Sequence, residues 1–67
     1  PGRAIVELRT ALQRDPYNQD LLGALLNYEL ETGDLRSALA RAETLARLLP
    51  DNRQIRHLIQ QLRQRVQ

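Results

Sequence analysis

The sequence predicts an all-α fold of about four helices, arranged as antiparallel helix-turn-helix repeats. Two turn-forming residues recur at an interval of 34 residues, namely Pro16 with Pro50 and Asn18 with Asn52. A period of this length is typical of helix-turn-helix arrays, in which one pair of helices cannot bury its apolar face alone. The apolar residues are mainly leucine and alanine in short periodic runs, which favour helices over strands.

The first predicted helix covers Arg3–Arg14. Its apolar residues recur at i, i+1, i+4, i+7 and i+8, which is the stripe of an amphipathic helix. They are Ala4, Ile5, Leu8, Ala11 and Leu12. Asp15 precedes Pro16, and because a residue before proline is pushed out of helical geometry, the helix is expected to stop there.

The second predicted helix covers Gln19–Thr32, with Asn18 as its N-cap and Gly33 supplying the positive φ that a helix end favours. Its apolar residues are too many for one narrow stripe: Leu21, Leu22, Leu25, Leu26, Tyr28 and Leu30. A helix that contacts neighbours on two sides needs that breadth. The second helix is therefore expected to lie between two others.

The third predicted helix covers Leu35–Leu49 and is capped by Asp34. The short Gly-Asp connection makes it an antiparallel neighbour of the second helix. Its expected inner face comprises Leu35, Ala38, Leu39, Ala42, Leu45 and Ala46. The second and third helices are expected to bury most of the core, with four leucines nearly inaccessible to solvent: Leu22, Leu25, Leu39 and Leu45.

The fourth predicted helix covers Arg53–Val66 and lies one period after the second. Leu22 of the second helix is replaced by Arg56, and Leu26 by Gln60. One apolar stripe remains, through Ile55, Leu58, Ile59, Leu62 and Val66. A helix that packs on one neighbour and is otherwise solvated is typical of the end of a repeat array.

Composition excludes several functional classes. There is no cysteine, and the only histidine, His57, has no sequence cue that it meets the only serine, Ser37. Glu29 and Glu31 point to different sides of a helix, so they are not paired for acid–base work. We therefore predict no enzyme activity, no metal and no cofactor. No apolar run approaches the ~18 residues of a membrane span.

All ten basic residues are arginine, which we attribute to a bacterial-like, arginine-favouring composition. The charge is unevenly distributed. Residues 1–46 contain five Arg against seven Asp and Glu, a balance of −2, and residues 47–67 contain five Arg against one Asp, a balance of +4. A basic last helix suggests nucleic-acid binding, but the third helix has mixed charges and no aromatic platform for bases exists. Nucleic acid is therefore not the expected partner.

The chain resembles a tetratricopeptide repeat protein. A repeat that starts at Gln19 places bulky residues at positions 4 and 7, alanine at 20 and proline at 32, as that family prefers. These residues are Leu22, Leu25, Ala38 and Pro50, and the departures are Leu26, Glu29, Ala42 and Leu45 at positions 8, 11, 24 and 27. The resemblance implies part of a right-handed α-solenoid and a C-terminal fragment of an array. Residues 1–16 would be the second helix of a partial repeat, 19–52 a complete repeat and 53–67 a capping helix. The partner helix of the first one is expected to be missing.

The resemblance also implies a non-catalytic module that binds a peptide or helix of a protein partner in a concave groove. The family's groove positions correspond here to Asp20, Gly23, Asn27, Leu30, Glu31, Gln54, His57, Gln61, Gln64 and Arg65. A lysine and asparagine clamp for a C-terminal carboxylate is not expected, since Gly23 stands at the lysine position. Two alternatives remain. The first helix would form a homo-oligomer with a copy of itself, or the chain would be a purely structural end repeat.

Overall fold

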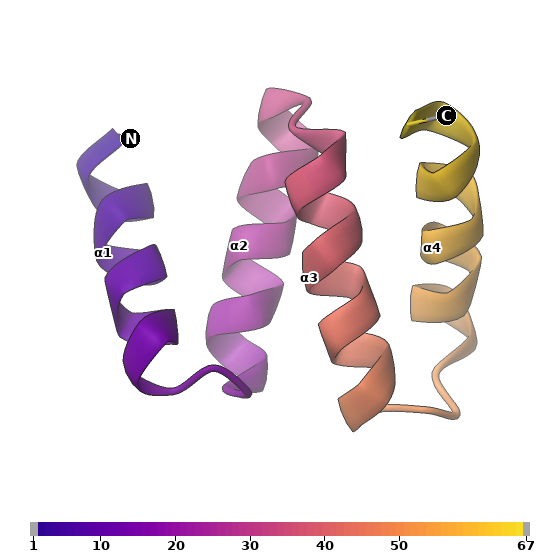
Figure 1. Cartoon of the computed structure of the whole chain (residues 1–67), viewed down its shortest axis with the longest axis horizontal. Coiled ribbons are helices and arrows are strands. Elements are labelled where there is room, and N and C mark those ends of the chain that lie inside the picture. The colour runs from indigo at the N-terminus through magenta and orange to yellow at the C-terminus, as the bar shows by residue number, and fades with distance from the viewer. Residues whose placement is uncertain (1, 67) are drawn as a thin grey trace.

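A computed structural model describes residues 2–66, and these form four α-helices and no strand. The helices are α1 (Gly2–Arg14), α2 (Gln19–Thr32), α3 (Leu35–Leu48) and α4 (Arg53–Val66). Each runs antiparallel to the one before it, and they stand side by side in chain order (Figure 1). Over the described residues, no helix is long and apolar enough to cross a membrane. The predicted all-α array is confirmed.

The helix starts follow from side-chain caps. At α2, α3 and α4, a side-chain oxygen of the residue before the helix accepts a hydrogen bond from the backbone N–H three residues later, which satisfies a group that the helix itself leaves unpaired. The pairs are Asn18 with Leu21 at 3.1 Å, Asp34 with Ser37 at 3.4 Å and Asn52 with Ile55 at 3.0 Å. The predicted caps Asn18 and Asp34 are confirmed.

The end of α3 differs from the prediction by one residue. Leu49 was expected inside the helix, but its backbone leaves helical geometry at φ −128° and ψ 67°. The reason is Pro50, because the residue before proline is sterically excluded from the α region. The N–H of Leu49 still donates to the carbonyl of Leu45 at 2.8 Å.

The connection between α2 and α3 depends on one glycine. Gly33 has φ +80°, as predicted. Its N–H donates to the carbonyl of Leu30 at 3.3 Å, and the N–H of Asp34 donates to that of Glu29 at 2.9 Å. This pair of bonds is the Schellman ending of a helix. It reverses the chain within two residues, so α3 returns directly along α2.

Alanine substitutions at two glycines should have opposite effects on stability. A methyl group at either Gly33 or Gly23 would meet no atom within 4 Å, so only the backbone conformation differs between the two sites. Gly33→Ala is expected to lower the free energy of unfolding by roughly 1–2 kcal/mol, because L-residues disfavour positive φ. Gly23→Ala, inside α2, should raise it by about 0.5–1 kcal/mol. Urea unfolding followed by circular dichroism measures both, and shifts of the same sign would contradict this reading.

The main core lies among α2, α3 and α4. Its buried members are Leu22, Leu26, Ala38, Ala42, Leu45, Ile59 and Leu62. The remaining buried apolar residues, Ile5 and Leu25, lie outside this cluster. Ile5 is buried against α2, since α1 contacts no other helix. As predicted, α2 lies between two neighbours, and α4 packs through one stripe centred on Ile59 and Leu62.

One expectation about burial is wrong. Leu39 is only half-buried, whereas Leu22, Leu25 and Leu45 are nearly inaccessible as predicted. The buried stripe of α3 follows positions 38, 42 and 45, and Leu39 lies about 100° around the helix from Ala38, at the edge of that stripe. Ala4 of α1 is exposed. The array is only 15 Å across in its shortest direction, so few positions are enclosed on every side.

Candidate functional site

A concavity lies between the C-terminal halves of α2 and α4. These two helices run in the same direction, with α3 between them in the row (Figure 1). The hollow has a volume of about 360 Å³. Leu30 lines it from α2, and α4 contributes Leu58, Gln61, Leu62, Gln64 and Arg65. Helix direction therefore positions this site, because α2 and α4 present their last turns at the same edge of the array.

The hollow has an apolar floor and a polar rim. Leu62 is buried and Leu30 and Leu58 are half-buried, while the remaining lining residues, Gln61, Gln64 and Arg65, are exposed. Ligand sites in proteins commonly combine apolar walls with a few polar groups that fix orientation. This hollow has room for one large apolar side chain. Two amides and one guanidinium surround it, and they can bind carbonyl oxygens or a carboxylate.

The structure brings four of the ten predicted groove residues to this hollow: Leu30, Gln61, Gln64 and Arg65. The other six, Asp20, Gly23, Asn27, Glu31, Gln54 and His57, do not line it. All of these except the half-buried Gly23 are exposed on α2 or α4. The sequence reasoning assigned Leu58 and Leu62 to the core alone. Leu58 lies three residues before Gln61 and Leu62 lies three before Arg65, and this spacing is the signal that places them beside the polar lining residues.

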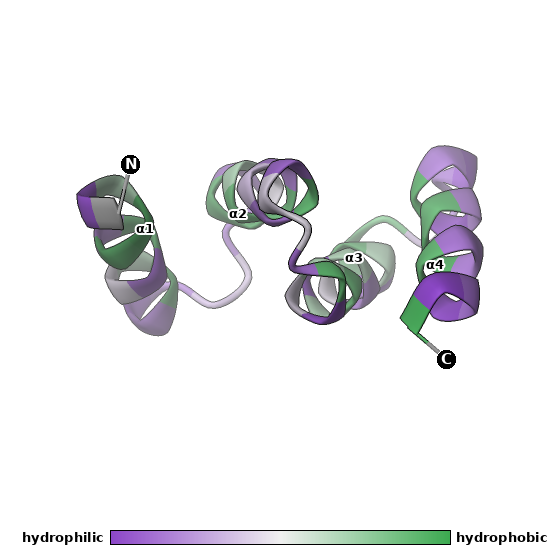
Figure 2. Ribbon diagram, turned by 90° about the horizontal axis from the view of Figure 1, so that it is seen from above, coloured by the Kyte–Doolittle hydropathy of each residue, from purple (hydrophilic) through white to green (hydrophobic). Residues whose placement is uncertain are grey.

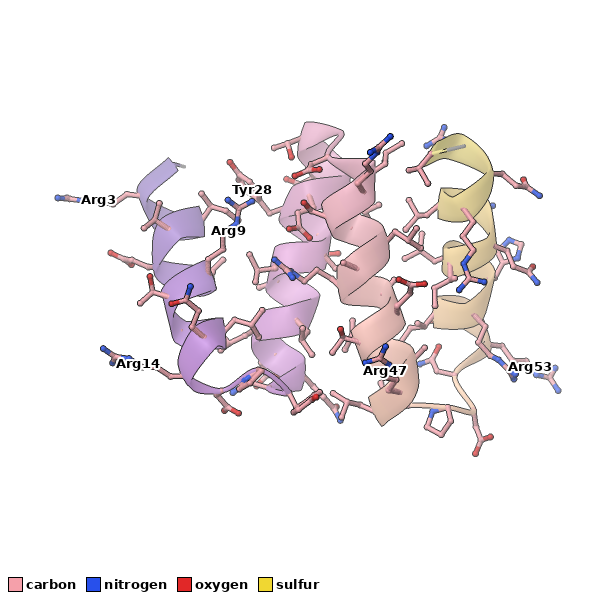
Figure 3. The ribbon with its side chains drawn as sticks, in the orientation of Figure 1. Arg3, Arg9, Arg14, Tyr28, Arg47 and Arg53 are labelled. Carbon is pink, nitrogen blue, oxygen red and sulfur yellow. The ribbon has the colours of Figure 1, made fainter. Side chains whose placement is uncertain are left out.

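A buried charge lies at the contact of α2 with its neighbours. The side chain of Glu29 is fully buried, and its Oε2 is 3.6 Å from Nη2 of Arg41 on α3. Neither carboxylate oxygen has a hydrogen-bond partner among the described residues. Burial raises the pKa of Glu29, and the positive charges of Arg41 and Arg9 oppose that rise. Figure 3 shows Arg9 extending from α1 toward α2, whereas Arg3 and Arg14 point away from the array.

This cluster was not predicted, although the sequence contains a signal for it. Glu29 lies seven residues after Leu22 and three after Leu26, on the same helical stripe as two core leucines. Glu31, two residues later, is exposed, in agreement with the expectation that the two carboxylates diverge. Glu29 therefore belongs to helix packing and not to a pair of acids in a cleft.

Asp34 has the opposite electrostatic environment. Hydrogen bonding from Ser37, through its side chain first and its backbone second, lowers the pKa of this exposed carboxylate. Ser37 is therefore engaged at the start of α3. His57 is in the first half of α4, which runs antiparallel to α3, so the two residues lie toward opposite ends of the two helices (Figure 1). No group of three or more potential metal-ligating side chains occurs within residues 2–66.

The row of antiparallel helices with a 34-residue period defines an α-helical repeat protein. The family model for the tetratricopeptide repeat matches residues 1–62, and the chain belongs to that family. The resemblance seen in the sequence is thereby confirmed. No curated protein and no solved structure gave a match. Members of the family are typically non-catalytic scaffolds that mediate protein–protein interactions.

Proposed function

We propose that this chain is a non-catalytic interaction module that binds a peptide or helix of a protein partner in the hollow between α2 and α4. The observation that supports this is the convergence of Leu30 with Gln61, Gln64 and Arg65 around one concavity. Leu30 is distant in sequence from the other three residues, and all four coincide with groove positions of the family. The partner segment would place an apolar side chain against Leu30 and Leu62.

The rim specifies the chemistry of that segment. Gln61 and Gln64 can each donate to and accept from a peptide backbone, and Arg65 is suited to a carboxylate through its paired N–H groups. The preferred ligand is therefore a short segment with one large apolar residue and a neighbouring acidic residue. Such peptide motifs bind grooves through a few anchoring side chains.

Peptide binding is tested by selection from a random peptide library displayed on phage. Enriched sequences should combine an apolar residue with an acidic one, and isothermal titration calorimetry should then give their affinity. The variant Leu30→Ser/Gln61→Ala/Arg65→Ala is expected to bind at least about tenfold more weakly, a loss of about 1.4 kcal/mol.

The matched control makes the same kinds of change on the exposed surface of α1: Val6→Ser/Gln13→Ala/Arg3→Ala. Val6 is 60% exposed and the other two residues are exposed as well, so this variant should bind as the wild type does. Equal loss in both variants, or undiminished binding by the hollow variant with intact helicity, would rule out the hollow as the binding surface.

A further inference from the structure

Three successive helices present a row of alternating charges around Glu29. Arg41 of α3 pairs with its carboxylate at 3.6 Å, and Arg9 of α1 acts on the same group through its charge. The order across α1, α2 and α3 is therefore positive, negative, positive. The negative member is enclosed between two helices and has no exposed surface.

The first two members of this row recur one repeat later with their charges reversed. α1 and α3 end 34 residues apart, and α2 and α4 begin 34 residues apart. Arg9 thus corresponds to Glu43, and Glu29 corresponds to Arg63. Arg63 donates a hydrogen bond from Nη2 to Oε2 of Glu43 at 3.0 Å. The order across α3 and α4 is therefore negative, positive. A third member would be an acidic residue on a helix packed against the free side of α4.

That side of α4 is open in the structure. Arg56, Gln60 and Arg63 occupy the positions that Leu22, Leu26 and Glu29 hold on α2. The side chain of Arg63 is 60% exposed, in contrast to the full burial of Glu29. A second hollow of about 260 Å³ lies there, lined by Ala46, Arg56, Ile59, Gln60 and Arg63. The open face of α4, defined by Arg56, Gln60 and Arg63, therefore has a site for a further helix.

One helix of this chain has the missing acidic residue at the required position. Arg41 corresponds, one repeat earlier, to Glu7 of α1. The buried stripe of α3, at 38, 42 and 45, corresponds to Ala4, Leu8 and Ala11 of α1, but these are exposed or half-buried. α1 therefore has the pattern of α3 with one side uncovered. Figure 2 places α1 and α4 at the two ends of the row.

We propose that α1 of a second copy packs on the open face of α4, as α3 packs on α2, and places its Glu7 beside Arg63. The contact joins opposite charges at Glu7 and Arg63, although α1 and α4 each carry a net positive charge. Because the two surfaces differ, the contact is heterologous and continues into longer assemblies. Arg56 and Gln60 make it more polar than the α2–α3 contact. It does not use the hollow at Leu30, so the two proposals fail or succeed separately.

Sedimentation velocity of the 67-residue chain tests the contact from micromolar to millimolar concentration in low-salt buffer. The sedimentation coefficient of the wild type should rise with concentration. Glu7→Arg and Arg63→Glu should each weaken association at least about tenfold, because each alone opposes like charges. An equimolar mixture of the two variants should associate again, because every contact between different chains then joins opposite charges.

Arg65→Glu is the matched control, since it makes the same charge change on the other side of α4 and should leave association unchanged. In Arg63→Glu the new carboxylate repels Glu43, and this repulsion can reduce helicity. If it does, Arg63→Gln replaces it in the test, because glutamine removes the positive charge without adding a negative one. A wild type that stays monomeric overturns the proposal and leaves the open face of α4 to a different acidic partner. Insensitivity to Arg63→Glu also overturns it, since that result fits α1 pairing with its own copy. The proposal is also overturned if the equimolar mixture of the two variants fails to associate, or if Arg65→Glu weakens association as much as Arg63→Glu does.

Discussion

Leu25→Ala is expected to lower the free energy of unfolding by roughly 2–5 kcal/mol, the range for leucine truncation in a packed core. Leu25 has no exposed surface, and it lies outside the main cluster of α2, α3 and α4. Shortening it leaves a void that a thin array cannot close easily. In a domain of this size a loss of that magnitude is a large part of the total stability.

Leu39→Ala is the control for this experiment, because it deletes the same atoms from a half-buried position on α3. Urea unfolding followed by circular dichroism should show a clearly smaller shift of the midpoint for Leu39→Ala than for Leu25→Ala. Midpoints shifted equally would mean that the burial of Leu25 does not decide its contribution.

Arg41→Met is expected to destabilise the fold by up to about 3 kcal/mol at neutral pH, because it leaves the buried carboxylate of Glu29 without its nearest positive charge. Methionine retains much of the aliphatic length of arginine, so the change tests the charge more than the packing. Arg36→Met on the exposed side of the same helix should change stability by less than about 0.5 kcal/mol.

The pH dependence distinguishes charge from packing in this variant. Burial raises the pKa of Glu29 in the folded state, so its contribution to stability is fully present below its unfolded pKa and is lost as pH rises through the folded value. The penalty of Arg41→Met should therefore shrink on mild acidification and be restored at neutral pH. Asp34 acts in the opposite sense. Its pKa is lowered by Ser37, and its contribution is lost only at more acidic pH.

Glu29→Gln completes this comparison. It should remove most of the pH dependence that Arg41→Met shows, since no titrating group then remains at that position. Stability measured by urea unfolding at neutral and mildly acidic pH provides the readout. A penalty of Arg41→Met that is the same at both pH values would show that the guanidinium acts through its packing alone.

The candidate site was only partly accessible to sequence reasoning. Leu30 and Gln61 were placed in a groove because the family's positions correspond to them, and the structure puts both at one hollow. Asp20 and His57 were assigned by the same correspondence, yet they lie outside that hollow. The correspondence gives a helix face but not the point along it where two helices form a concavity. That point depends on how closely α2 and α4 approach at each turn.

The sequence by itself determined the local features of this protein. Three such features are the cap at Asn18, the positive φ at Gly33 and the helix end before Pro50. All three follow from interactions within about four residues, so the local sequence is enough to predict them. The periodicity of the sequence predicted the burial of Leu22, Leu25 and Leu45, but only the tertiary structure decided the burial of the residues at the edges of each stripe. Glu29 is enclosed and Leu39 remains partly exposed because burial depends on how neighbouring helices pack, which sequence periodicity approximates but does not specify.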